Sequence, residues 1–361
     1  MSIMIRDFNN LFAQMSGMPI NSKDGRNLLK NNGIDTNSKQ YQAVMKSMSA
    51  SVGAGVGYTN PQAIKNLMKS YDKDGNYITI TFEDITNYED REKVGKLLEK
   101  ELKELFKKNN IKDSDECLVI GLGNRLSTAD SLGVKVLDHI VITRHLFLIN
   151  ANVKEGFRIV SGFTPSVLGQ TGIETKDVIV SLINAVKPKF VIAIDSLASS
   201  SIDRINKTIQ ITDTGIHPGS GVGNNRKELS KKTLGIPVIA IGVPTVVSSS
   251  IIVNDTLNYL FKHLSYIKDN KETNKLIIKR NNRYKDKIKD RDLSQEEKNN
   301  LLGLVGSLDN DTKKRLMEEV LTSINANLIV TSTEIDFLID KLSNLISSAL
   351  NNSLHRQITH Y

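Results

Sequence analysis

The chain has 361 residues, of which 39% are hydrophobic and 5% aromatic, and it carries a formal net charge of +8 at pH 7. This length allows a sizeable core, while the absence of an eighteen-residue apolar run and of an apolar start excludes a membrane span and a signal peptide, so we expect a cytoplasmic protein. The single cysteine, Cys117, excludes an internal disulfide and a cysteine-based zinc cluster. Because it opens an apolar strand, we expect it in the core.

The positive charge is concentrated in one part of the chain. About half of the surplus lies between Lys268 and Lys298, where basic and acidic residues alternate, a pattern typical of a solvated helical face or linker. Aromatic residues are not interleaved with the basic ones, and no nucleic-acid-binding signature is present, so we expect no direct nucleic-acid contact. The surplus would attract an acidic protein substrate.

The first 75 residues differ in composition from the rest of the chain. They are polar and contain the small-residue stretch 49–57, which predicts a separate, partly mobile leader. Residues 72–76, Asp-Lys-Asp-Gly-Asn, look like part of a calcium loop, but no register places glycine sixth and glutamate twelfth. We predict a turn there.

From Tyr77 onward, strand and helix patterns alternate. This order predicts an α/β domain over residues 76–361, with a mostly parallel sheet covered by helices. The domain includes a charged helical segment at 265–300 and a C-terminal helix at 333–354 that packs back on it. The predicted strands are 77–82, 117–121, 190–194, 208–211 and 238–241, and the predicted helices are 90–108, one after Thr128, and 174–186.

Two aspartates follow strands of this predicted sheet. Asp130 comes after the strand 117–121 by way of a turn, and Asp195 directly follows the strand 190–194. Since the carboxyl ends of parallel strands gather at one edge, the two carboxylates could share a cleft, where one would act as acid and the other as base on water. Both also precede predicted helices, and an aspartate there is commonly a cap. Spacing alone leaves both interpretations open.

Other polar residues are candidates for lining such a cleft. Asn124 and Thr128 lie in the turn before Asp130, Ser220 lies in the glycine-rich stretch 218–224, and His145 follows Thr143 and Arg144. The stretch 218–224 lacks the Gly-Lys-Ser/Thr ending of a P-loop and the spacing of a dinucleotide fingerprint.

Asp213 begins an Asp-Thr-Gly sequence of the kind found in pepsin-like and retroviral aspartic proteases. Those enzymes need two copies and an all-β fold, so a turn-stabilising role is the alternative. The six histidines show no zinc-ligand spacing, and no Gly-x-Ser-x-Gly elbow is present. We expect neither metal nor cofactor, and water as the nucleophile.

At these residues the sequence resembles the germination protease family. The resemblance runs from about Asn76 to His355 in ordered blocks, with a poorly matching stretch between Lys268 and Leu301. The blocks lie at 121–124, 128–133, 141–146, 169–175, 194–198, 208–216, 218–224, 236–247 and 327–336.

The resemblance implies an atypical aspartic endopeptidase, made as a zymogen in the developing spore and assembled as a homotetramer. It implies small acid-soluble spore proteins as the substrate, a location in the forespore or spore core, and a fold like that of hydrogenase-maturation peptidases. The family's two essential aspartates fall on Asp130 and Asp195. Ser131 and Ser196 stand where the family has alanines, and the first 75 residues lack the family's self-cleavage sequence.

Two alternatives belong to other functional classes. Hydrogenase-maturation endopeptidases carry a similar Gly-x-Gly-Asn turn followed by an acidic residue and recognise nickel through it, but they are much shorter. A catalytically inactive relative that serves as a scaffold is the second alternative, although both aspartates are retained in this sequence.

Overall fold

The computed structural model describes most of the region predicted as the peptidase domain. All described residues belong to the unit Asn60–Tyr361 and cover 64–71, 75–149, 151–219, 226–269, 288, 290–322 and 328–356. The predicted leader up to residue 63, positions 72–74 of the predicted turn, Ser220 and residues 270–287 of the charged segment lie outside them.

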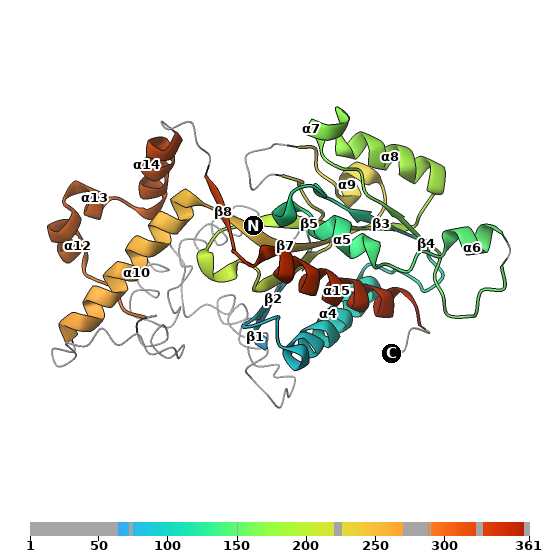
Figure 1. Cartoon of the computed structure of the whole chain (residues 1–361), viewed down its shortest axis with the longest axis horizontal. Coiled ribbons are helices and arrows are strands. Elements are labelled where there is room, and N and C mark those ends of the chain that lie inside the picture. The colour runs from blue at the N-terminus through green and yellow to red at the C-terminus, as the bar shows by residue number, and fades with distance from the viewer. Residues whose placement is uncertain are drawn as a thin grey trace, which may run out of the picture. The chain divides into compact units, whose positions relative to one another are not determined.

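A single mixed sheet forms the centre of the domain (Figure 1). Its order is β1-β2-β6-β7-β5-β3-β4, and β8 pairs with β7. Adjacent strands are parallel within the group β4-β3-β5-β7. The other pairs, which are β1 with β2, β2 with β6, β6 with β7 and β7 with β8, are antiparallel. The bounds are β1 (Ile64–Tyr71), β2 (Asn76–Phe82), β3 (Cys117–Gly121), β4 (Val160–Phe163), β5 (Phe190–Ser199), β6 (Thr208–Thr212), β7 (Val238–Ser248) and β8 (Ile329–Thr331).

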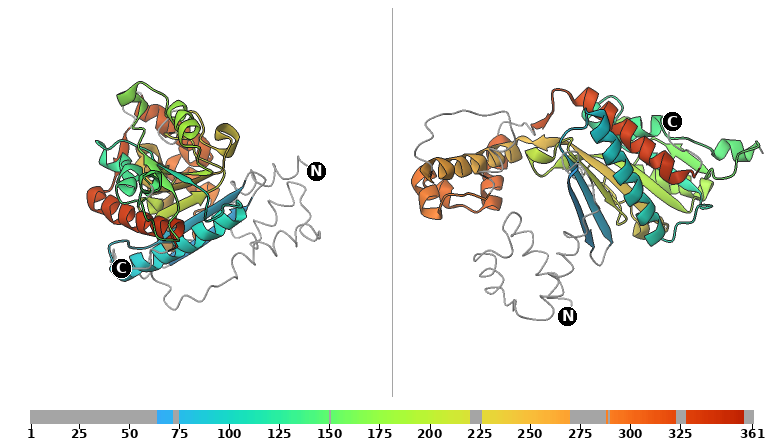
Figure 2. Two further views of the ribbon diagram at one scale, coloured as in Figure 1. Left: turned by 90° about the vertical axis from the view of Figure 1, so that its right-hand side faces the viewer. Right: turned by 90° about the horizontal axis from the view of Figure 1, so that it is seen from below.

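Helices cover both faces of the sheet (Figures 1 and 2). One face carries α4 (Tyr88–Lys108), α5 (Leu132–Asp138) and α15 (Ile335–Leu354), with α4 and α15 side by side, and the other carries α8 (Thr175–Val186) and α9 (Lys231–Leu234). Successive residues of β3 alternate between the two cores, since Val119 packs on the first face and Leu118 and Ile120 pack on the second. Burial on both sides explains the unbroken apolar run of this strand.

The predicted α/β class is confirmed, with three differences in detail. β5 continues beyond Ile194 to Ser199 because β7 runs beside it as far as the pair Ser199 and Val247. Residues 64–71, which fall in the predicted leader, form a strand that pairs with β2. β6, predicted within a mostly parallel sheet, is antiparallel to both β2 and β7.

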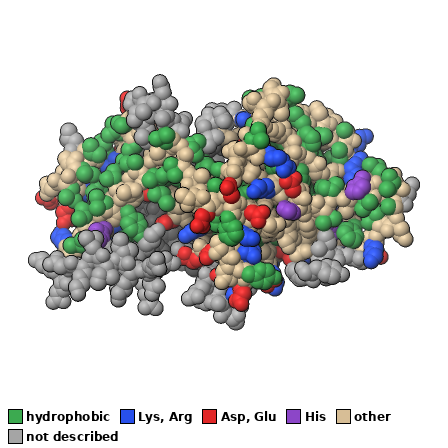
Figure 3. Space-filling model, in the orientation of Figure 1, with side chains coloured by type: hydrophobic (Ala, Val, Ile, Leu, Met, Phe, Trp, Pro, Cys, Tyr) green, Lys and Arg blue, Asp and Glu red, His purple; other side chains and the backbone are tan. Residues whose placement is uncertain are grey.

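A helical segment joins β7 to β8. It contains α10 (Ser249–Asp269), α12 (Gln295–Leu302), α13 (Leu304–Ser307) and α14 (Asn310–Thr322). Phe261 is buried there, with the ammonium groups of Lys298 and Lys313 5.5 and 5.9 Å from its ring centroid. Several apolar side chains of these helices remain exposed (Figure 3), among them Val253, Leu260 and Ile267 of α10. None of the helices in the described ranges is long and apolar enough to cross a membrane.

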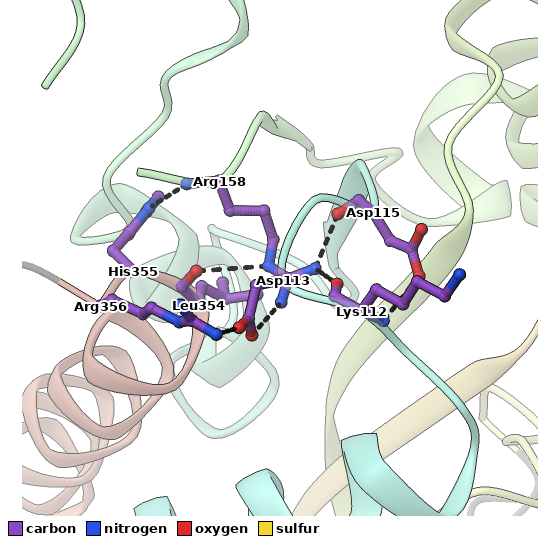
Figure 4. Close-up of polar contacts among 7 residues, drawn as sticks. All are labelled: Lys112, Asp113, Asp115, Arg158, Leu354, His355 and Arg356. Atoms are coloured by element: carbon purple, nitrogen blue, oxygen red, sulfur yellow. Dashed lines mark hydrogen bonds and ion pairs between the residues drawn. The ribbon is translucent and has the colours of Figure 1, made fainter. Parts of the chain in front are cut away.

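The end of α15 is fixed to the sheet by Arg158 (Figure 4). This buried guanidinium donates to the carbonyl oxygens of Lys112 at 2.6 Å, Asp115 at 2.7 Å and Leu354 at 3.2 Å, and it lies 5.3 Å from the ring centroid of Phe190. The backbone N–H of Arg158 donates to Nδ1 of the buried His355 at 3.1 Å. One side chain thus connects the loop before β3, the start of β4 and the C-terminal helix.

Candidate active site

Asp130 follows strand β3, and Asp195 lies within the neighbouring parallel strand β5, beside the carboxyl end of β3. The paired part of β3 ends where Gly121 faces Ile194, and the N–H of Leu122 adds one more bond to the Ile194 carbonyl at 2.8 Å. β5 continues beyond this point beside β7. Asp195 therefore lies at the point where β3 has ended and β5 continues, a position typical of active sites in α/β proteins.

The loop after β3 ends in the 3-10 helix η1 (Thr128–Asp130), which places Asp130 near the carboxyl end of β3. The N–H of Asn124 donates to the Asp130 carbonyl at 2.9 Å, and Oγ1 of Thr245 in β7 donates to the Ala129 carbonyl at 2.7 Å. Gly123 has φ +106°, and a Cβ at this position would lie 2.0 Å from the Asp130 carbonyl oxygen. Only glycine allows this closure.

Helix α5 begins directly behind the two aspartates. Gly133 in its first turn packs so closely on β5 that a Cβ there would lie 2.2 Å from the Ile194 carbonyl oxygen. A larger residue would push the helix away from the strand that carries Asp195. The glycine therefore sets how closely α5, which follows η1, approaches the strand that carries Asp195.

Both carboxylates line one cavity of about 660 Å³. Its walls come from the loop after β3, the carboxyl ends of β5 and β7, the loop after β6, and β8. In the described part of the chain, no group of three or more His, Cys, Asp or Glu side chains is arranged to hold a metal ion. The residues that line the cavity include Asp130, Asp195, His217, Arg226, Thr245, Ile329 and Thr331.

Burial strongly disfavours ionisation of Asp195, whose residue is 5% exposed. Loss of water raises its pKa to about 8, and the charge of Asp130 adds to this rise. The N–H of Ser196, which donates to Oδ1 at 2.9 Å, and the positive charge of Arg226 oppose it. At neutral pH the carboxyl of Asp195 is therefore protonated.

Asp130 is half-buried, and its pKa is raised less. Desolvation raises the pKa to about 6, while a backbone hydrogen bond from Asn124 and the charge of Arg226 lower it. Asp195 therefore keeps its proton to higher pH than Asp130 does. Because the groups interact, the two titration steps belong to the pair.

We expect Asp195→Asn to stabilise the fold in a pH-dependent way. The pKa of Asp195 is raised in the folded state, so the fold binds its proton more tightly than the unfolded chain does and loses stability as pH rises from about 4 to about 8. Asparagine does not titrate. The variant should match the wild type near pH 4 and exceed it by roughly 2–5 kcal/mol in free energy of unfolding at pH 8.5. Urea unfolding at both pH values measures this, and a difference independent of pH would contradict it.

The other residues predicted to line the cleft occupy different places. Asn124 lies beside the cavity, where its Oδ1 accepts hydrogen bonds from the Leu126 N–H and from Gln170 Nε2, both at 2.9 Å. Thr128 opens η1, and its carbonyl accepts from Ser131 Oγ at 2.8 Å. Neither is among the residues that line the cavity. Ser220 lies outside the described residues.

His145 and Asp213 lie away from the cavity. His145 is exposed in α6 (Arg144–Leu148), whose Arg144 pairs with Glu116 at 2.9 Å, just before the amino end of β3. Asp213 follows β6, which runs antiparallel to β7, so it emerges at the opposite edge of the sheet from Asp195. There its carboxylate accepts from the N–H of Asn76 at 2.7 Å and from Asn109 Nδ2 at 2.8 Å. Its carboxylate thus links the end of β6 to the start of β2 and the end of α4.

Sequence reasoning missed the rest of the cavity wall. Arg226 is the arginine among the residues lining the cavity and acts on both carboxylates. A cation two residues after the glycine-rich stretch 218–224 was the available signal. Thr245 and β8 gave no comparable signal, because their positions depend on sheet pairing.

The chain is similar to known peptidases over most of its length. The germination protease family model matches residues 26–361. A germination protease of Geobacillus sp. (strain WCH70) is 46% identical over 293 residues, which cover 79% of each chain. Germination proteases of Bacillus subtilis (strain 168) and Bacillus cereus (strain AH187) are each 45% identical over 293 residues. The first alignment covers 80% of this chain and the second covers 79%, and each covers 80% of the relative. The resemblance predicted from the sequence is confirmed, and the chain belongs to the germination protease family of peptidases.

Proposed function

We propose that this protein is an endopeptidase that begins the degradation of small acid-soluble spore proteins during germination, and that Asp130 and Asp195 activate the attacking water. The observation that carries the proposal is the pair of carboxyls with raised and separated pKa values in one cavity. Pairs of titratable groups whose environments separate their pKa values are typical of acid–base catalysis. Family membership supports a protein substrate.

In the proposed reaction, ionised Asp130 takes a proton from water as the water oxygen attacks the peptide carbonyl carbon. Protonated Asp195 donates its proton to the amide nitrogen as the C–N bond breaks, so the products are a carboxylic acid and an amine. Asp130 then holds one proton and Asp195 none. Transfer of that proton through solvent restores the starting state.

The biological setting is also part of the proposal. We infer synthesis as a zymogen in the forespore, action in the spore core and assembly as a homotetramer, each supported by the resemblance to germination proteases. The surplus of basic residues, +8 overall, favours binding of acidic proteins.

The pH dependence of cleavage tests this function. We expect kcat/KM of the purified full-length chain on a small acid-soluble spore protein to be highest between about pH 6 and about pH 8. Below this window Asp130 gains a proton and the base is lost, and above it Asp195 loses its proton and the acid is lost. Mass spectrometry identifies the cut sites and any new amino terminus. A rate that keeps rising above pH 9, or no cleavage at any pH, would contradict the proposal.

A further inference from the structure

A second cavity, of about 810 Å³, adjoins the one that contains the aspartates. The two cavities share Thr331 of β8, and they lie on the two sides of that strand. Ile329 and Thr331 line the first cavity, and Val330 and Thr331 line the second. Both apolar and polar residues line the second cavity. Its lining includes Glu83, Asp84, Ile85, Ile202, Ile205, Asn206, Lys207, Ile252, Glu334 and Leu338.

Asn206 carries an unsatisfied amide at this second cavity. The residue is 5% exposed, and neither Oδ1 nor Nδ2 has a hydrogen-bond partner in the described structure. Its backbone is fixed in the left-handed region, with φ 53° and an N–H that donates to the Pro244 carbonyl at 2.7 Å. Both amide atoms are also closed to solvent. A buried amide without partners is costly, so a ligand that supplies one donor and one acceptor would favour rotation of this side chain toward the cavity. A peptide group is such a ligand.

The outer edge of β8 offers further peptide-binding groups. Among the strands of the described ranges, β8 pairs with β7 alone. The Ser249 N–H donates to the Leu328 carbonyl at 2.9 Å, so these two residues form a hydrogen-bonded pair. Hydrogen-bonded and non-hydrogen-bonded pairs alternate in an antiparallel ladder. The N–H and C=O groups of Ile329 and Thr331 therefore point away from β7. Ile329 and Val330 are 47% and 42% exposed. Extended peptides commonly add to such an edge.

We propose that β8 and the second cavity form a subsite for an extended segment of the polypeptide substrate. The segment pairs with the outer edge of β8, so that its alternate side chains enter the two cavities. The Asn206 side chain rotates toward the second cavity and its amide bonds one peptide group, while an apolar side chain packs on Ile202 and Ile205. The subsite rests on the proposed function, because it presents a substrate to the neighbouring aspartates.

Binding to an inactive full-length chain tests the subsite without requiring turnover. In an Asp195→Asn background, we expect Asn206→Gly to weaken binding of a fluorescently labelled twelve-residue spore-protein peptide by about tenfold, measured by anisotropy. Glycine accepts the left-handed backbone of position 206 while removing the amide. Asn110→Gly is the matched control, because Asn110 has φ 56° and is exposed beyond α4. Equal affinity of the Asn206→Gly and Asn110→Gly chains would overturn the subsite.

The strand edge is tested in the same assay. Ile329→Pro removes one outward N–H, whereas Ile329→Val keeps it, so only the proline variant should lose about tenfold in affinity. Equal binding by these two variants would overturn the β8 pairing.

Kinetics in the active chain then separate the subsite from a general structural effect. Asn206→Gly should raise KM for the twelve-residue substrate while kcat stays the same, and the loss in kcat/KM should be much smaller for a four-residue substrate. Equal losses for both lengths would contradict the subsite. If the wild type cuts neither peptide but Asn206→Gly still weakens binding, the proposed function fails and the subsite stands.

Discussion

Replacing either aspartate of the cavity by asparagine is expected to reduce kcat/KM on a spore protein by about 10²–10⁴-fold. Asparagine keeps the shape of the side chain but can neither accept the proton of water nor donate one to the leaving nitrogen. Because the carboxyls act as a unit, the double variant should be little worse than either single variant. Rates from initial-velocity assays at pH 7, with circular dichroism to verify folding, measure the effect.

Asp213→Asn is the matched control for this experiment. Asp213 lies at the opposite sheet edge and accepts hydrogen bonds from Asn76 and Asn109, so its replacement should affect stability and leave turnover near the wild-type value. Wild-type turnover in Asp130→Asn or Asp195→Asn would refute the proposed roles. Loss of turnover in Asp213→Asn alone would favour the Asp-Thr-Gly mechanism instead.

Arg158→Met is expected to cost roughly 3–5 kcal/mol in free energy of unfolding. Methionine fills similar space but leaves the carbonyls of Lys112, Asp115 and Leu354 without the donor that now satisfies them (Figure 4). A buried unsatisfied group, as at Leu354, costs about 1–3 kcal/mol, and the partly exposed carbonyls of Lys112 and Asp115 cost less. Urea denaturation measures the total, and hydrogen exchange should show earlier opening of α15, whose end loses one of its attachments.

Arg125→Met provides the comparison for a surface arginine. Arg125 forms a two-pronged pair with Asp138 at 2.8 and 2.9 Å, but its side chain is 60% exposed, so its loss should cost no more than about 1 kcal/mol. If the two methionine variants were equally stable, Arg158 would not have the anchoring role described above.

The sequence predicted the parts of the fold that depend on local pattern. Residues 77–82 alternate and 117–121 are continuously apolar, and both are strands, because burial of one or two faces directly determines such patterns. The direction of β6 depends on which neighbour it pairs with, which no local pattern contains. β8 is too short, at three residues, to produce a recognisable period.

The same distinction applies to the candidate site. Asp130 and Asp195 could be singled out because the carboxyl ends of parallel strands in an α/β fold gather at one edge. Asp195, predicted to follow its strand, lies within β5 at the point where β3 ends. The prediction for His145 was wrong because the chain has returned to the amino end of β3 at that residue. The prediction for Asp213 was wrong because β6 runs antiparallel to β7, so the residue after β6 emerges at the other edge of the sheet. Asn206 could not be found from sequence, because an asparagine in a turn is ordinary until its amide is seen to be buried without partners.

The burial of Cys117 has a practical consequence. The thiol is 1% exposed at the start of β3, between β4 and β5, and desolvation raises its pKa far above the neutral range, so it should not react with maleimides in the folded protein. As it is the only cysteine in the sequence, a cysteine introduced on the surface would be the sole reactive thiol. A dye or spin label could then be attached at one chosen position without first altering the natural chain.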